Sequence, residues 1–96
     1  MDERIYELVR NNLEIAFSNF ADLSSRQSKM QNMWEFENLS EFLHGYMIGD
    51  LSATAFVTSR MVKMSPLTNE EIERIHSMVK DYRFKIKELV EKIREA

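Results

Sequence analysis

A run of apolar residues at alternating steps of three and four constrains this chain more than any other feature. Its members are Ile72, Ile75, Val79, Tyr82, Ile86, Leu89 and Ile93. This spacing follows the 3.6-residue turn of an α-helix, and its regular alternation gives a coiled-coil-like line of side chains. Thr68 and Glu71 can form a capping box at the start, with Leu67 placed to pack on Ile72. The sequence therefore predicts a helix over about 69–95.

The N-terminal third of the chain repeats the helical spacing. Between Ile5 and Leu23 apolar residues again fall three or four positions apart, and Trp34 continues the rhythm. No glycine or proline interrupts this stretch, although the serines at positions 24–25 lower its helix propensity. We therefore predict a helix over about 2–35, with a break near the serines.

Signals at both ends mark a middle helix. Asn38 is a good N-cap, and Glu41, three positions later, can reach back to an unpaired backbone N–H. Pro66 disfavours a helical residue before it, so the helix is expected to span about 39–64. Apolar residues lie on almost every side of this segment, which is typical of a buried helix. We expect it to be the central helix on which the other two pack.

Composition agrees with one all-α domain. The 96 residues are 44% apolar and 30% charged, which is typical of folded domains rather than of disordered chains. No segment has the alternating pattern of a strand. We predict a single domain over 1–96, in which three long helices form an antiparallel bundle. Because a core of this size is small, we expect dimerisation to complete the bundle, with the first or middle helix at the interface.

Charge and residue types argue against several classes of function. A formal charge of -3 gives no overall attraction to phosphate backbones or anionic lipid, which disfavours nucleic acid as a partner. The absence of cysteine excludes disulfides, thiolate metal sites and cysteine nucleophiles. The N-terminal segment lacks the apolar run of a signal peptide, and no apolar run is long enough to cross a membrane. We expect a soluble, cytoplasmic protein.

The middle helix contains both glycines of the chain. Gly45, Gly49 and Ala53 are spaced by four and would form a smooth strip along one side of the helix. Each glycine inside a helix costs roughly 0.5–1 kcal/mol relative to alanine, so a close contact should compensate. The favoured interpretation is close packing against another helix, of the same chain or of a symmetry mate. The alternative is a pocket floor, where a small apolar ligand binds beside Gly45 and Gly49.

A carboxylate follows directly after the second glycine. On a helical wheel Asp50 lies near Tyr46 and Val57, on the apolar side of the middle helix. A buried carboxylate needs a partner, because unpaired charge is costly in a protein interior. The available partners are Arg60, Arg74, Arg83 and Tyr82. The favoured interpretation is a structural pair, or a position at the edge of a short bundle where water reaches the carboxylate; a ligand-binding or catalytic carboxylate is the alternative.

Both histidines follow a glutamate by three positions. The pairs are Glu41/His44 and Glu73/His76. This spacing places a carboxylate and an imidazole on one helix face, as in di-metal carboxylate bundles. With Asp50 or Glu14 as a further carboxylate, the pairs would form a ligand set for iron, manganese or zinc. Twelve glutamates make such pairs common by chance, so a solvated helix face is the favoured interpretation and metal binding the alternative.

No glycine-rich phosphate loop and no serine, histidine and acid constellation is evident. The simplest role for Met30, Met33, Trp34 and Phe36 is in the core or at an interface. Our leading hypothesis is a non-enzymatic protein–protein interaction or structural module that acts as a homodimer without a cofactor. The alternative is a carboxylate-histidine bundle, ferritin-like or di-metal, that binds a divalent transition metal. A binder of a small apolar ligand is the second alternative.

Overall fold

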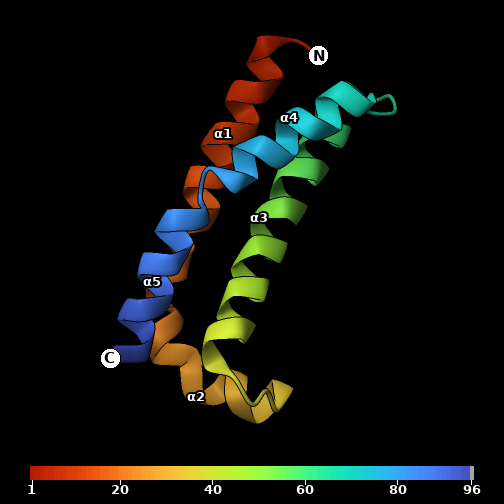
Figure 1. Cartoon of the computed structure of the whole chain (residues 1–96). Helices are drawn as coiled ribbons and strands as arrows, with labels where there is room; N and C mark the ends of the chain where they lie inside the picture. Colours follow the sequence, from red (N-terminus) through yellow and green to blue (C-terminus); the bar gives the residue numbers. More distant parts are fainter. Residues whose placement is uncertain (96) are drawn as a thin grey trace.

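The computed structural model describes residues 1–95, and it is helical throughout this range apart from the connecting turns (Figure 1). The elements are α1 (Glu3–Ser18), the 3-10 helix η1 (Asn19–Asp22), α2 (Leu23–Trp34), α3 (Leu39–Lys63), α4 (Asn69–Lys80) and α5 (Arg83–Glu95). Figure 1 shows the chain passing along α1, returning along α3, and reversing again through α4 and α5. The prediction of an all-α chain is confirmed, and its long helical segments run antiparallel.

The predicted N-terminal helix is interrupted at η1, just before the serines at positions 24–25. The hydroxyl of Ser18 donates to the carbonyl oxygen of Ile15 at 2.7 Å, a bond of the kind that bends helices. Residues three apart share one side of a 3-10 helix, and Phe20 and Leu23 are both buried here. The tighter turn therefore keeps both side chains in the core while α2 changes direction.

Local capping signals position the other helix ends as the sequence predicted. The Asn38 side chain accepts a hydrogen bond from the Glu41 amide at 3.0 Å at the start of α3. Thr68 and Glu71 form a capping box at the start of α4, with the Glu71 amide 3.1 Å from the Thr68 hydroxyl. Helix α3 ends at Met64, whose backbone is left-handed with φ of 59°. The Asn38 cap fixes the start of α3, and the capping box together with Met64 fixes the loop between α3 and α4.

The predicted C-terminal helix is divided into α4 and α5 by a turn at Asp81 and Tyr82. The Tyr82 amide bonds to the carbonyl oxygen of Val79 at 3.0 Å, which is a tighter connection than an α-helical one. The Tyr82 side chain is buried at the turn, and its hydroxyl donates to Glu14 of α1. This long-range contact explains a bend that no glycine or proline marks in the sequence.

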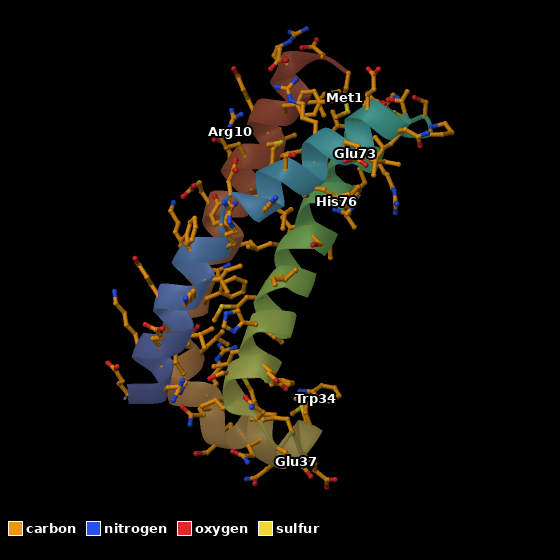
Figure 2. The ribbon with its side chains drawn as sticks, viewed as in Figure 1. Met1, Arg10, Trp34, Glu37, Glu73 and His76 are labelled. Atoms are coloured by element: carbon orange, nitrogen blue, oxygen red, sulfur yellow. The ribbon has the colours of Figure 1, made fainter. Side chains whose placement is uncertain are left out.

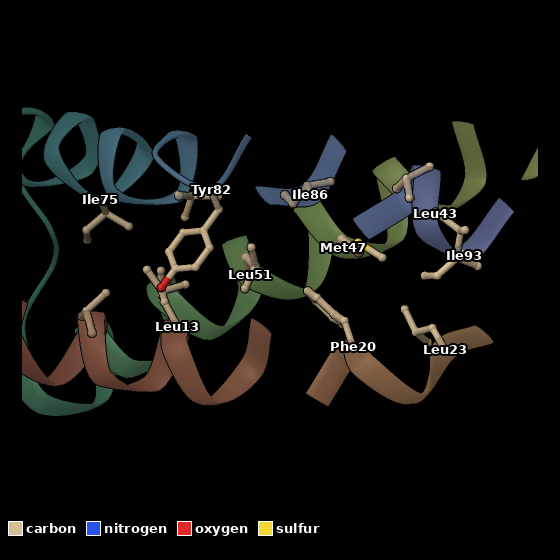
Figure 3. Packing of buried hydrophobic residues seen from close by; sticks show 14 of the residues in the cluster. Leu13, Phe20, Leu23, Leu43, Met47, Leu51, Ile75, Tyr82, Ile86 and Ile93 are labelled. Atoms are coloured by element: carbon tan, nitrogen blue, oxygen red, sulfur yellow. The ribbon is translucent and has the colours of Figure 1, made fainter. Parts of the chain in front are cut away.

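The core lies between α1, α3 and the α4–α5 pair (Figure 3). Its largest fully buried apolar side chains are Val9, Leu13, Leu43, Met47, Leu51, Ile75, Ile86 and Val90. In α3 the buried residues follow one another in steps of four, as Leu43, Met47, Leu51, Ala55 and Ser59. The other helices do pack on α3, as expected, but the expectation of a buried helix is wrong: α3 contributes one side to the core, and many of its other apolar residues are exposed.

A matched pair of substitutions on α1 tests this core. Leu13 is 1% exposed and Ile15 is 61% exposed, although they are two positions apart. We expect Leu13→Ala to lower the free energy of unfolding by about 2–5 kcal/mol, because it removes buried methyl groups and leaves a cavity. Ile15→Ala should change it by less than about 0.5 kcal/mol. Urea unfolding followed by circular dichroism measures both, and equal effects would contradict the assigned core.

Candidate functional site

One exposed side of α3, which we call the outer face, contains most of the residues singled out on the middle helix. It comprises Gly45, Tyr46, Gly49, Asp50, Ala53, Val57, Arg60, Met61 and the C-cap residue Met64. The buried side of α3 faces α1 and α5, which both lie on one side of α3 in Figure 1. At 100° per residue, the outer face is roughly opposite Leu51 at the centre of that buried side. It is an apolar surface with one acidic and one basic residue.

The glycines of the outer face do not pack against another helix of this chain. A Cβ atom built on Gly45 or on Gly49 would have no heavy atom within 4 Å outside its immediate helical surroundings. The interpretation of close packing within the chain is therefore wrong. The space beside both glycines is open rather than a walled pocket, and it leaves the backbone of α3 accessible to a second molecule.

Asp50 lies on the outer face and is exposed, not buried as the helical wheel suggested. Among residues 1–95 no cation lies within ion-pair distance of its carboxylate, and Arg60 also makes no ion pair. Three of the four predicted partners contact other groups: Arg74 binds Glu3, Arg83 donates to the carbonyl of Lys80, and Tyr82 donates to Glu14. Exposure explains why Asp50 needs no partner within the chain.

Tyr46 extends the outer face toward the loop between α2 and α3. Its ring stacks with Phe42 at a centroid distance of 6.1 Å, and Phe42 stacks on Phe36 at 4.1 Å. This aromatic row orders Tyr46 while leaving it 43% exposed. Met33 and Trp34, which were expected in the core or at an interface, are exposed at the end of α2 near this loop, so they do not belong to the core of the chain. An ordered, half-exposed tyrosine is a typical anchor residue at protein interfaces.

The structure does not bring the two Glu-x-x-His pairs together. His44 is near the start of α3, where its Nδ1 atom lies 2.8 Å from the carbonyl oxygen of Ser40. His76 contacts Phe56, and Phe56 is 12 positions after His44, about 18 Å along the helix axis. Figure 2 shows Glu73 and His76 on α4, far from Trp34 at the opposite end. Residues 1–95 contain no group of three or more potential metal ligands from His, Cys, Asp and Glu.

Tyr82 and Glu14 border a small hollow between α1 and the α4–α5 turn. Its volume is about 180 Å³, and its lining also includes Arg10, Asp81 and Lys85. This volume is below the range of about 300–1,000 Å³ that is typical of ligand pockets. Burial, together with the hydrogen bond to Glu14, raises the pKa of Tyr82, so its hydroxyl stays protonated as a donor. The contact holds α1 against the turn between α4 and α5.

A buried carboxylate was missed by the sequence reasoning, which assigned Glu71 only to a helix cap. Glu71 accepts hydrogen bonds from the Lys63 ammonium and from the Thr68 amide, the latter at 2.8 Å. Its second oxygen lies 3.0 Å from the α-amino nitrogen of Met1. The Lys63 ammonium, followed by the Thr68 amide, lowers the pKa of Glu71 to about 2. This cluster joins α1, the end of α3 and the start of α4.

Comparison of the chain with protein-family models, with curated proteins and with solved structures gives no match. None of the helices within residues 1–95 is long and apolar enough to cross a membrane. The functional interpretation therefore depends on the geometry of the described residues, and the outer face of α3 is their most distinctive surface.

The Glu71 cluster predicts a specific loss of stability in acid. Because folding lowers the pKa of Glu71 from 4.5 to about 2, its contribution is fully present above pH 4.5 and is lost as the pH falls toward 2. We expect Glu71→Gln to lower the melting temperature at pH 7 and to flatten its pH dependence between pH 5 and 2. Thermal unfolding across this range measures both effects. The exposed neighbour Glu70 provides a control, since Glu70→Gln should keep the wild-type pH dependence.

Proposed function

We propose that this chain is a non-enzymatic interaction module that acts as a homodimer through the outer face of α3. The observation that supports the proposal most is the exposure of large apolar side chains on this face. Tyr46, Val57, Met61 and Met64 are 43%, 52%, 72% and 86% exposed. The largest apolar patch on a typical monomer covers about 300–600 Å² and is often functional, so this surface is a candidate interaction site.

The size of the outer face is adequate for a stable dimer. Taking about 150 Å² for each large side chain, the four exposed fractions leave roughly 400 Å² of apolar area uncovered. Typical interfaces are about 57% non-polar, so this area corresponds to roughly 700 Å² for each chain. Standard interfaces bury about 600–1,000 Å² of each partner. A second copy of the chain therefore fits the available surface.

The composition of the outer face also favours association. Gly49 and Ala53 expose backbone that another helix can approach closely, which would compensate for the helix propensity lost at glycine. Met61 and Met64 have flexible side chains that adapt to a partner surface. A domain of 96 residues has a small core, so burial of this face would add appreciably to its stability.

Light scattering coupled to size-exclusion chromatography tests the proposal. At micromolar concentration we expect the wild-type chain to show twice the monomer mass of 11.4 kDa. Val57→Glu should give a folded monomer, because it places a charge at the centre of the outer face. Ile15→Glu, on the exposed side of α1, should stay dimeric. A monomeric wild type would refute the proposal, and a dimeric Val57→Glu variant would move the interface elsewhere.

A further inference from the structure

The outer face contains a second heptad-like line of residues, separate from the one that forms the core. We call it the outer seam: Tyr46, Asp50, Ala53, Val57, Arg60 and Met64, spaced by four, three, four, three and four. All six are exposed. Alternating steps of three and four are the spacing by which one helix packs its side chains between those of another. The outer seam therefore has the geometry of a coiled-coil surface without a partner in this chain.

We infer that a second copy of the chain packs on the outer seam with α3 antiparallel to its partner, about a two-fold axis that crosses the outer seam at the level of residue 55 along the helix. This inference rests on the proposed function, because it specifies how the proposed dimer is arranged. A two-fold axis at this position places residue 55 − n opposite residue 55 + n of the partner. The six seam positions are symmetric about 55, so this register leaves no seam residue unmatched.

The side chains that this register brings together are complementary in charge. Asp50 meets the partner's Arg60, and Arg60 meets the partner's Asp50, so one pairing occurs twice. Neither residue makes an ion pair within residues 1–95; Arg60 lies over its own Phe56 ring at 5.6 Å. A parallel, in-register dimer would instead oppose Asp50 to Asp50 and Arg60 to Arg60, which like-charge repulsion disfavours. Charge thus selects the antiparallel orientation.

The same register is complementary in size. Small Ala53 meets the partner's Val57, and Tyr46 meets the partner's Met64. Beside the seam, Gly49 lies level with the partner's Met61 but on the opposite flank of the interface. The open space at Gly49 lets the partner helix approach the backbone of α3 closely. The position of Gly49, which no contact within the chain explains, is then accounted for by the close approach of the partner helix.

Charge reversal tests the arrangement. Asp50→Arg leaves two positive residues facing each other across the interface, and Arg60→Asp leaves two negative ones. We expect each variant alone to dimerise at least tenfold more weakly than the wild type, by analytical ultracentrifugation. An equimolar mixture of the two should form a heterodimer with wild-type affinity, because every facing pair again has opposite charges. The double variant Asp50→Arg/Arg60→Asp should also recover the homodimer.

Cysteine cross-linking provides a readout that does not depend on charge. The natural chain has no cysteine, so Ala53→Cys and Val57→Cys each add one thiol. We expect a mixture of the two to form a disulfide-linked heterodimer faster than either variant cross-links to itself. Circular dichroism verifies that each variant is folded.

The outcomes separate the two proposals. A wild-type dimer that is unaffected by both charge reversals, or whose variants fail to form the heterodimer on mixing, overturns this arrangement and leaves the homodimer in place. Faster self-linking of Val57→Cys than cross-linking of the mixture also overturns it. A wild-type monomer overturns both the arrangement and the proposed function.

Discussion

Burial of one narrow side of α3 is the constraint on which the rest of the structure depends. The buried residues of α3 follow in steps of four, from Leu43 to Ser59. Each step of four rotates about 40° around an α-helix, so over four steps the buried side turns by about 160°. A single straight helix cannot follow such a winding stripe. Two shorter helices can, and the turn at Tyr82 lets α5 cover one end of the stripe while α4 crosses the other (Figure 1).

Features determined by neighbouring residues were predictable from the sequence. The caps at Asn38 and Thr68 and the helical class of every long segment depend on interactions within a few residues. The turn at Tyr82 was not predictable, because a buried hydrogen bond to Glu14, 68 positions away, holds it. The Glu71 cluster was found only in part for the same reason. Its cap is local, whereas Lys63 belongs to α3 and Met1 precedes α1.

In the candidate site, too, the sequence indicated which residues to single out but not whether they are buried or exposed. Sequence reasoning selected Gly45, Gly49, Ala53 and Asp50, which all lie on the outer face, but it put Asp50 on the apolar side of the helix and left open whether the glycines pack within the chain or on a second copy. A helix with apolar residues on all sides gives no periodic signal of which side is buried. Packing against α1, α4 and α5 determines which side is buried, because their apolar stripes cover only one side of α3. In the sequence, the strict steps of four at Leu43, Met47 and Leu51 were the signal that indicated the buried side.

The weak anchoring of α2 has an energetic consequence for the whole domain. Leu23 is the only fully buried residue that the 12 residues of α2 contribute. Segments with so little buried apolar area open at a low free-energy cost, independently of global unfolding. Amide protons of α2 would therefore exchange with solvent long before those of α1 and α3, which share the core. Stability therefore differs along the 41 Å length of the domain, and Trp34 at the end of α2 belongs to its most easily opened part.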